Sequence, residues 1–382
     1  MNKSCGDPND TARGESVTKG DLVAGYRDDT IVAAVPLRDA DGQVQPGEAT
    51  ATRCAGVVAD AVACGRRALL HILDVSKTGL LAPGPDVVRM IEATDPGQVD
   101  VVVDACQTRL DAARVRGYVE AGWMALVTGS KFFTGPPFAG AVLMPPAVRR
   151  RLDRAGLPSG LRAYSGRAEW PLDAPGADDA LAPGGNLGLA LRWQAALAEM
   201  RAFAAVEPAA RSALLATFIE WVRAGIVATP CLRLLAVPPL DRDGPPDEAW
   251  DTIGTILSFA VCRPGSDDPL GVAEARQIYR WLNADLAAAL PPDLARGERD
   301  LARRRFHIGQ PVPLRGHGAE FGALRISAGA RLVAVEPSHA HLSVAQRLEK
   351  EVADALAALA KVSLILRHLD RLRAADPPAS FL

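Results

Sequence analysis

Three polar side chains stand at fixed points in an otherwise apolar stretch, and their types suit one kind of chemistry. Asp104 ends the run VDVVVD, Gln107 follows shortly after, and Lys131 lies in the small-residue turn TGSK. A partly desolvated lysine can form a Schiff base with a carbonyl group. A carboxylate can keep a pyridine nitrogen protonated, and an amide can donate to a phenolate oxygen on the same ring. The pattern predicts that one aromatic ring bridges Asp104 and Lys131.

Two residues with hydroxyl groups and a second lysine could also take part in this chemistry. Thr128 and Ser130 flank the glycine before Lys131 and can donate to a phosphate, with help from local backbone amides. The structural alternative is that Lys131 is merely solvent-exposed and Asp104 caps the next helix. Lys77, in DVSKTG, is a rival Schiff-base lysine, but no Asp-x-x-Gln precedes it.

The first half of the chain alternates between strands and helices that would position these residues. Strands are predicted at 30–38, 68–74, 99–104, 125–128 and 140–144, and helices at 48–64, 85–93 and 108–121. Solidly apolar strands in such an alternation are typical of a mainly parallel sheet covered on both faces. Ligands of these sheets bind beyond the carboxyl ends of the strands, where Asp74, Asp104 and the turn with Lys131 all fall.

In the second half of the chain, the regular alternation of strands and helices ends. Residues 147–185 are rich in Pro, Gly and Arg and predict a connecting segment. Helices are predicted at 187–204, 209–224, 271–290 and 348–369, and strands at 252–261 and 323–327. We therefore predict a mobile leader at 1–29, a large α/β domain at 30–224 and a smaller α+β domain at 225–382.

The segment VDACQ followed by TGSKFFTGPPFAGAVLMP resembles the class V aminotransferase branch of fold type I pyridoxal-phosphate enzymes, which includes cysteine desulfurases and several lyases. The resemblance implies pyridoxal 5'-phosphate as cofactor, with Lys131 holding it as a Schiff base. It further implies that Asp104 contacts the pyridine nitrogen, Gln107 the ring oxygen, and Thr128 and Ser130 the phosphate.

The resemblance continues downstream and implies a substrate. Arg325, in ALRIS, matches the family's arginine for the substrate carboxylate. Leu324 and Ile326 share one face of that predicted strand, so Arg325 points to the other face. The resemblance implies a small molecule, an amino acid, as substrate, and a homodimer. This chain has Gly185 where relatives often carry a threonine that reaches the phosphate from the other subunit.

The family's N-terminal portion has no counterpart here. Only 103 residues precede Asp104, and we find neither a phosphate loop nor a residue to stack on the ring. The chain start lies downstream of the true one, or the chain is a natural truncation that holds cofactor poorly. No cysteine occurs within 263–382, which argues against desulfurase activity. His71 is predicted as a satisfied core histidine and Cys106 as a small buried side chain.

Composition excludes several classes of function. The formal net charge of −2 favours binding to neither nucleic acid nor membranes, and the arginine clusters at 149–151 and 303–305 fit solvated surfaces. The six cysteines form no metal-ligand or disulfide pattern, which predicts a cytoplasmic protein with reduced thiols and no metal.

The sequence therefore predicts a pyridoxal-phosphate enzyme of the aminotransferase type. Two alternatives remain open. One is a truncated, non-catalytic relative with a binding or scaffold role. The other is a pyridoxal-phosphate lyase that acts on an aromatic amino acid.

Overall fold

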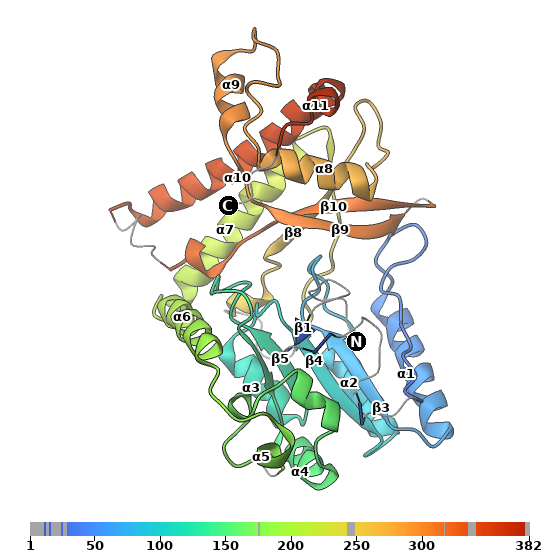
Figure 1. Ribbon diagram of the computed structural model, residues 1–382. Helices are drawn as coiled ribbons and strands as arrows, with labels where there is room; N and C mark the ends of the chain where they lie inside the picture. Colours follow the sequence, from blue (N-terminus) through green and yellow to red (C-terminus); the bar gives the residue numbers. More distant parts are fainter. Residues whose placement is uncertain are drawn as a thin grey trace.

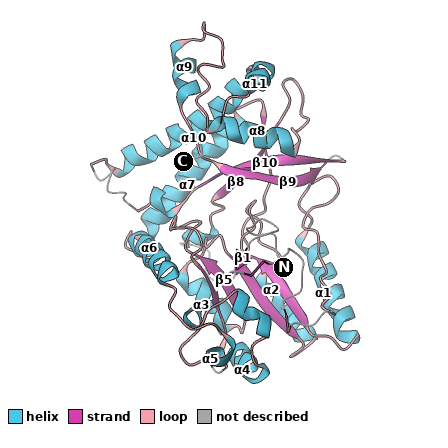
Figure 2. Ribbon diagram, in the orientation of Figure 1, coloured by secondary structure: helices cyan, strands magenta, loops and turns pink. Residues whose placement is uncertain are grey.

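The computed structural model describes residues 11–12, 15–16, 24–25, 29–174, 176–242, 249–316, 318–334 and 341–378. Two four-stranded sheets lie one above the other, with helices around them (Figures 1 and 2). Most of the predicted leader at 1–29 lies outside the described residues. Within it, the two-residue strands β1 (Thr11–Ala12) and β2 (Glu15–Ser16) pair with each other.

The lower sheet has the order β3-β4-β5-β6. Its strands are β3 (Ala68–Leu73), β4 (Val99–Ala105), β5 (Met124–Thr128) and β6 (Gly140–Leu143). The pairs β3–β4 and β4–β5 are parallel, and β6 is antiparallel to β5. A mainly parallel sheet within a mixed α/β fold is thus confirmed.

Helices cover one face of this sheet. A single buried apolar cluster joins α1 (Gly47–Ala63), α2 (Pro85–Thr94) and α3 (Ala112–Glu120) to the strands. On β3, Leu69 alternates with these inward residues and is 62% exposed. The prediction that both faces are covered is therefore wrong at β3, whose outer face is open to solvent.

The upper sheet is antiparallel and has the order β7-β8-β10-β9. Its strands are β7 (Leu232–Leu234), β8 (Ile256–Val261), β9 (Gly309–Gly316) and β10 (Ala319–Ser327). The helices of this part are α7 (Pro208–Val227), α8 (Val272–Leu282), α9 (Arg296–Arg303), α10 (Val344–Arg367) and α11 (Leu369–Ala375). The largest buried cluster lies between this sheet and its helices, which gives the α+β organisation expected for the C-terminal part. The predicted boundary at residue 225 falls within α7 and stays a prediction.

Two predicted elements are wrong. Residues 30–38 form no strand, and Ile31 and Val32 are 72% and 85% exposed, because no neighbouring strand pairs with this apolar run. Residues 147–185 are more than a connection. They hold most of α4 (Pro146–Ala155) and the short helices η1 (Ser159–Ala163), η2 (Arg167–Glu169) and α5 (Ala177–Ala180). A proline at the start of α4 and an Arg149–Asp153 ion pair one turn apart favour that helix.

Local capping explains where other elements begin. The prediction for α6 (Leu187–Ala204) is confirmed, and the side chain of Asn186 caps its first turn. Helix α3 begins only at Ala112, because Asp111 caps it and Thr108 has a φ of 48°. The short turns η3 (Trp250–Thr252) and η4 (Ala330–Leu332) flank the upper sheet.

Among the described residues, no single helix is both long and apolar enough to cross a membrane. Helices α6 and α7 meet that criterion only as a pair, and they are bent by 99° relative to each other.

Candidate functional site

Three turns meet where β3, β4 and β5 end, on the side of the lower sheet that faces the upper sheet (Figure 1). Asp104 lies at the end of the central strand, in register with Leu73 of β3 and Leu126 of β5. Because parallel strands end at the same edge, the side chains that follow them are brought together. This edge is where the sequence placed its candidate residues.

The hydroxyl groups of Thr108 and Thr128 tie two of these turns to each other. Thr108 Oγ1 is 2.7 Å from the carbonyl oxygen of Thr128 and accepts from the Thr128 amide at 2.9 Å. The hydroxyl of Thr128 in turn donates to the carbonyl of Cys106 at 2.8 Å. The donor of Thr128 is therefore used within the fold, and its predicted contact with a phosphate stays a prediction. Ser130 is half-buried in the same turn.

Among the described residues, only one carboxylate oxygen of Asp104 accepts a hydrogen bond. Its Oδ1 accepts from the Cys106 amide at 3.0 Å, and its Oδ2 lies 3.9 Å from Nε2 of His71 on β3. The side chains of Asp104 and His71 are 24% and 46% exposed, so the prediction of a core histidine is wrong. His71 instead lies on the open face of β3 beside Asp104. Within the described parts of the chain, Asp104 Oδ2 accepts no hydrogen bond.

Lys131 is exposed and lines a cavity of about 250 Å³ between the two sheets. The Phe132 amide, next along the chain, donates to the carbonyl of Gln107 at 3.3 Å, which sets the turn of Lys131 beside that of Gln107. Asp104 does not line this cavity.

The charges of Asp104 and Lys131 both affect the pKa of the half-buried thiol of Cys106. Burial, assisted by the adjacent Asp104 carboxylate, raises the pKa of Cys106 to about 12, while the charge of Lys131 opposes the rise. Asp104 and Lys131 thus act in opposite directions on one group. A thiol held protonated in this way is a poor nucleophile.

Arg325 reaches the same junction from the upper sheet. On β10, Leu324 and Ile326 are buried while Arg325 is not, which confirms the predicted alternation. Its Nη1 donates to the carbonyl of Lys77 at 3.0 Å, and its Nε and Nη2 donate to the carbonyl of Gln310 at 3.3 and 3.2 Å. Burial lowers the pKa of Arg325. The predicted contact with a substrate carboxylate stays a prediction.

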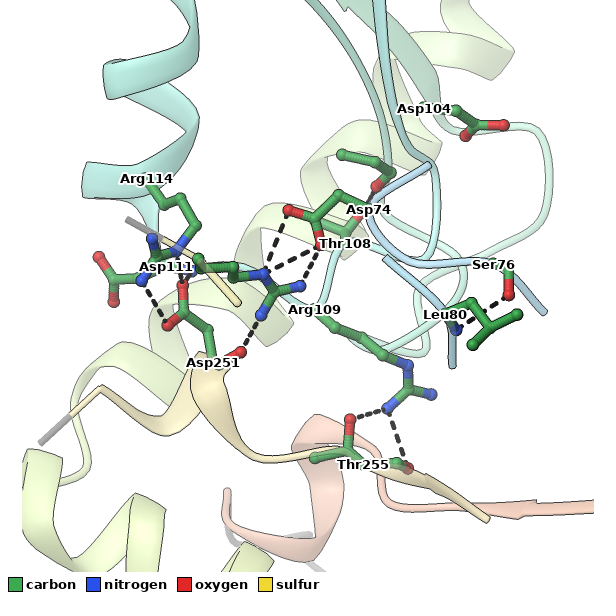
Figure 3. A network of polar contacts seen from close by, with 12 residues as sticks. Asp74, Ser76, Leu80, Asp104, Thr108, Arg109, Asp111, Arg114, Asp251 and Thr255 are labelled. Carbon is green, nitrogen blue, oxygen red and sulfur yellow. Dashed lines mark hydrogen bonds and ion pairs between the residues drawn. The ribbon is translucent and has the colours of Figure 1, made fainter. Parts of the chain in front are cut away.

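A buried charge network that the sequence analysis missed lies beside these turns (Figure 3). Asp74 forms an ion pair with Arg242, and the hydroxyl of Tyr118 donates to Asp74 Oδ2 at 2.7 Å. Arg242 also donates to the carbonyl of Asp251. Asp74 was visible as a polar residue at a strand end, but Arg242 lies in a polar loop with no distinguishing pattern.

Asp251 continues the network toward α3. Its carboxylate accepts from Arg114 Nε at 2.7 Å and from the Asp111 amide at 3.1 Å. Burial alone would raise the pKa of Asp251, but these donors lower it below its ordinary value. The network fixes the segment before β8 against α3, and so fixes the upper sheet above the candidate residues.

No protein-family model matches the chain, and no curated protein matches its sequence. Among solved structures, a NifS-like protein matches at 14% identity over 85% of this chain and 67% of its own, with a TM-score of 0.41. The TDC of Oryza sativa, solved with PLP and tryptamine, matches at 10% identity over 86% and 55%, with a TM-score of 0.43. A 3-amino-5-hydroxybenzoic acid synthase matches at 15% identity over 86% and 74%, with a TM-score of 0.41. This chain thus spans between 55% and 74% of the length of those three chains.

Proposed function

We propose that the chain binds pyridoxal 5'-phosphate through Lys131 and acts on an amino acid in the manner of an aminotransferase. The observation that carries this proposal is the hydrogen bonding of the Asp104 carboxylate. One oxygen of its carboxylate is held by the Cys106 amide, and the other accepts no hydrogen bond from the residues described. A protonated ring nitrogen is the donor that this oxygen lacks. The ring end of the cofactor therefore fits the residues present.

Each candidate residue has a role in this proposal. When bound, the cofactor supplies an electron sink for charge that develops at the substrate α-carbon. Asp104 holds the ring nitrogen in its protonated form. The amine of Lys131 carries the cofactor and then takes and returns the proton at the α-carbon.

The remaining candidates position the two ligands. Gln107 donates its side-chain amide to the ring oxygen, and Thr128 and Ser130 contact the phosphate. Arg325 orients the substrate carboxylate through its planar guanidinium. To do so, it must give up its present bonds to the carbonyls of Lys77 and Gln310.

A homodimer in the cytoplasm is part of the same proposal. Support for the dimer comes from α6, where Leu187, Leu191 and Leu197 are 70%, 55% and 39% exposed. Exposed apolar side chains on one helix are typical of a protein interface.

Absorption spectroscopy tests the cofactor proposal. Purified chain incubated with pyridoxal 5'-phosphate and then desalted is expected to keep a visible absorption band. Lys131→Ala should abolish the band, whereas Lys77→Ala, which removes the rival lysine, should retain it. A band that survives in Lys131→Ala and disappears in Lys77→Ala would overturn the assignment.

A binding or scaffold role is the second candidate, and the open face of β3 favours it. Leu69 is 62% exposed and the His71 side chain 46% exposed on that face. A folded chain that keeps no visible band after incubation would support this role over the enzyme.

A further inference from the structure

Arg109 is a buried cation that forms no ion pair with the acidic residues in the described segments of the chain. It is 6% exposed, and its hydrogen bonds all come from Nη1, chiefly to Thr255 Oγ1 and the carbonyl of Ala328, each at 2.7 Å. In the part of the chain that the structure describes, its Nε is buried without an acceptor, and its hydrogen bonds leave Nη2 unused (Figure 3). These two nitrogens form one edge of the guanidinium, and two parallel donors on such an edge match a carboxylate or a phosphate.

The charges around Arg109 leave it uncompensated. Arg242 is paired with Asp74, and Arg114 is paired with Asp251, so the buried carboxylates are already taken. Burial first, and then repulsion from Arg325 and Arg242, lowers the pKa of Arg109 to about 9. A buried charge without a counter-charge is unfavourable, and an incoming anion would relieve it.

The backbone directs Arg109 into the junction between the sheets. Thr108 has a φ of 48°, a left-handed conformation that is strained for a β-branched residue. Arg109 then extends over the ring of Phe132, with Cζ at 5.3 Å from the ring centroid. Its bonds to Thr255 and Ala328 connect the lower sheet to the upper one. The strained backbone at Thr108 therefore helps to position the Arg109 guanidinium at this junction.

Arg109 and Lys131 line the same cavity of about 250 Å³. The wall also contains Thr134 and Ser327, whose hydroxyl groups can donate, and Glu351. Its volume lies below the range of about 300–1,000 Å³ that holds drug-sized ligands, so it suits a small metabolite. Arg331, which is paired with Glu199, also lines the cavity. Three cations and two hydroxyl groups against one carboxylate give the cavity a net preference for negative charge.

We propose that this cavity binds the oxyanion group of a small molecule, a carboxylate or a phosphate, between the guanidinium of Arg109 and the ammonium of Lys131. The inference does not require the cofactor, because it uses the charge of Lys131 and not its ability to form a covalent bond. The oxyanion can come from a phosphate or from a carboxylic acid, and the choice between them is open to direct measurement.

Thermal unfolding with added anions tests the site. Inorganic phosphate and acetate, each compared with chloride at equal ionic strength, are titrated against the purified chain. At least one of them should raise the Tm in a saturable manner beyond chloride, and which one does so identifies the anion. Arg109→Met should weaken that binding by at least about tenfold. Arg296→Met, which removes an arginine whose side chain is 97% exposed, should leave it unchanged.

Two further variants keep the test decisive if Arg109→Met fails to fold. Glu351→Gln removes the carboxylate from the cavity wall and should tighten anion binding several-fold. Lys131→Arg keeps the positive charge but removes the amine, so it should retain anion binding while losing the visible band expected with pyridoxal 5'-phosphate. Lack of a specific effect of either anion on the wild-type chain, or equal binding by wild type and Glu351→Gln, would overturn the site. Absence of the band in the wild-type chain would count against the cofactor and not against the anion site.

Discussion

Asp74 and Arg242 form an ion pair whose two side chains are 1% and 0% exposed. The pair connects the turn after β3 to the loop between β7 and β8 of the upper sheet, although the two residues are far apart in sequence. Tyr118 completes the hydrogen bonding of Asp74. Because both charges are removed from water, each depends on the other, and this dependence leads to the first prediction.

Arg242→Met should destabilise the chain by about 3–5 kcal/mol, since it leaves the carboxylate of Asp74 buried without a counter-charge. Urea unfolding followed by circular dichroism measures the change. The double variant Asp74→Asn, Arg242→Met removes both charges and should recover a large part of the loss. A loss as small as that caused by an exposed arginine variant would show that the pair does not hold the sheets together.

Lys361 should make the stability of the chain depend on pH in an unusual direction. It is fully buried on α10, and its ammonium donates to the carbonyl of Ala284 at 2.7 Å. Burial lowers its pKa from 10.5 to about 8. Below the folded value both states carry the proton, and the penalty of burying the charge is complete. As pH rises from 8 toward 10.5, the folded chain releases the proton while the unfolded chain keeps it, so the Lys361 contribution to stability rises.

Lys361→Met removes that contribution. The difference in unfolding free energy between wild type and Lys361→Met, measured in urea at several pH values, should change between pH 8 and 10.5 in favour of the wild type. Other groups titrate equally in both proteins and cancel in the difference. A pH-independent difference would mean that Lys361 keeps an ordinary pKa in the folded chain.

Asp104→Asn tests the ring contact without changing the shape of the side chain. A charge-assisted hydrogen bond contributes about 1.5–3 kcal/mol, so cofactor affinity should fall about tenfold or more. Equilibrium titration with pyridoxal 5'-phosphate measures the affinity. His71→Gln, on the neighbouring strand, is the matched control and should change it less. Equal effects of the two variants would remove the special role given to Asp104.

Gly135→Ala should displace α6 from the turn that carries Lys131. A Cβ at this position would lie 2.7 Å from the carbonyl oxygen of Gly129 and 2.8 Å from the Cβ of Ala196. Overpacking of this kind typically destabilises by about 1–3 kcal/mol. Gly140→Ala, where no atom lies within 4 Å of the added carbon, should have a much smaller effect on Tm. A similar Tm for both variants would contradict the close approach of α6.

The sequence allowed prediction where local signals agreed with the fold. The apolar run of β4 ends in a carboxylate, and Asn186 caps α6, so both elements were found with nearly correct bounds. Strand β9 was missed because GQPVPLRG contains two prolines, which a strand tolerates at the sheet edge that β9 occupies. The apolar run at 30–38 predicts a strand that the fold does not contain, because apolar composition alone cannot show whether a partner strand exists.

Much of the candidate site was also beyond local prediction. The turns with Asp104 and Lys131 could be placed at one edge because parallel strands end together. The partners of Asp74 and Arg109 could not be found, since Arg242 and Thr255 lie in distant segments that only tertiary packing brings near. His71 was misassigned because β3 is an edge strand, whose outer face the pattern alone does not reveal.

If Arg325 binds the substrate carboxylate as proposed, its bonds to the carbonyls of Lys77 and Gln310 link that binding to the placement of the two sheets. An anion that attracts this guanidinium must first pull it from the turn after β3, which loosens a direct link between the two sheets. Ligand selectivity at this position would then be set by how easily the sheets move apart as well as by the ligand's own charge. Variants that stiffen the junction should bind such an anion more weakly, even when they touch nothing in the site.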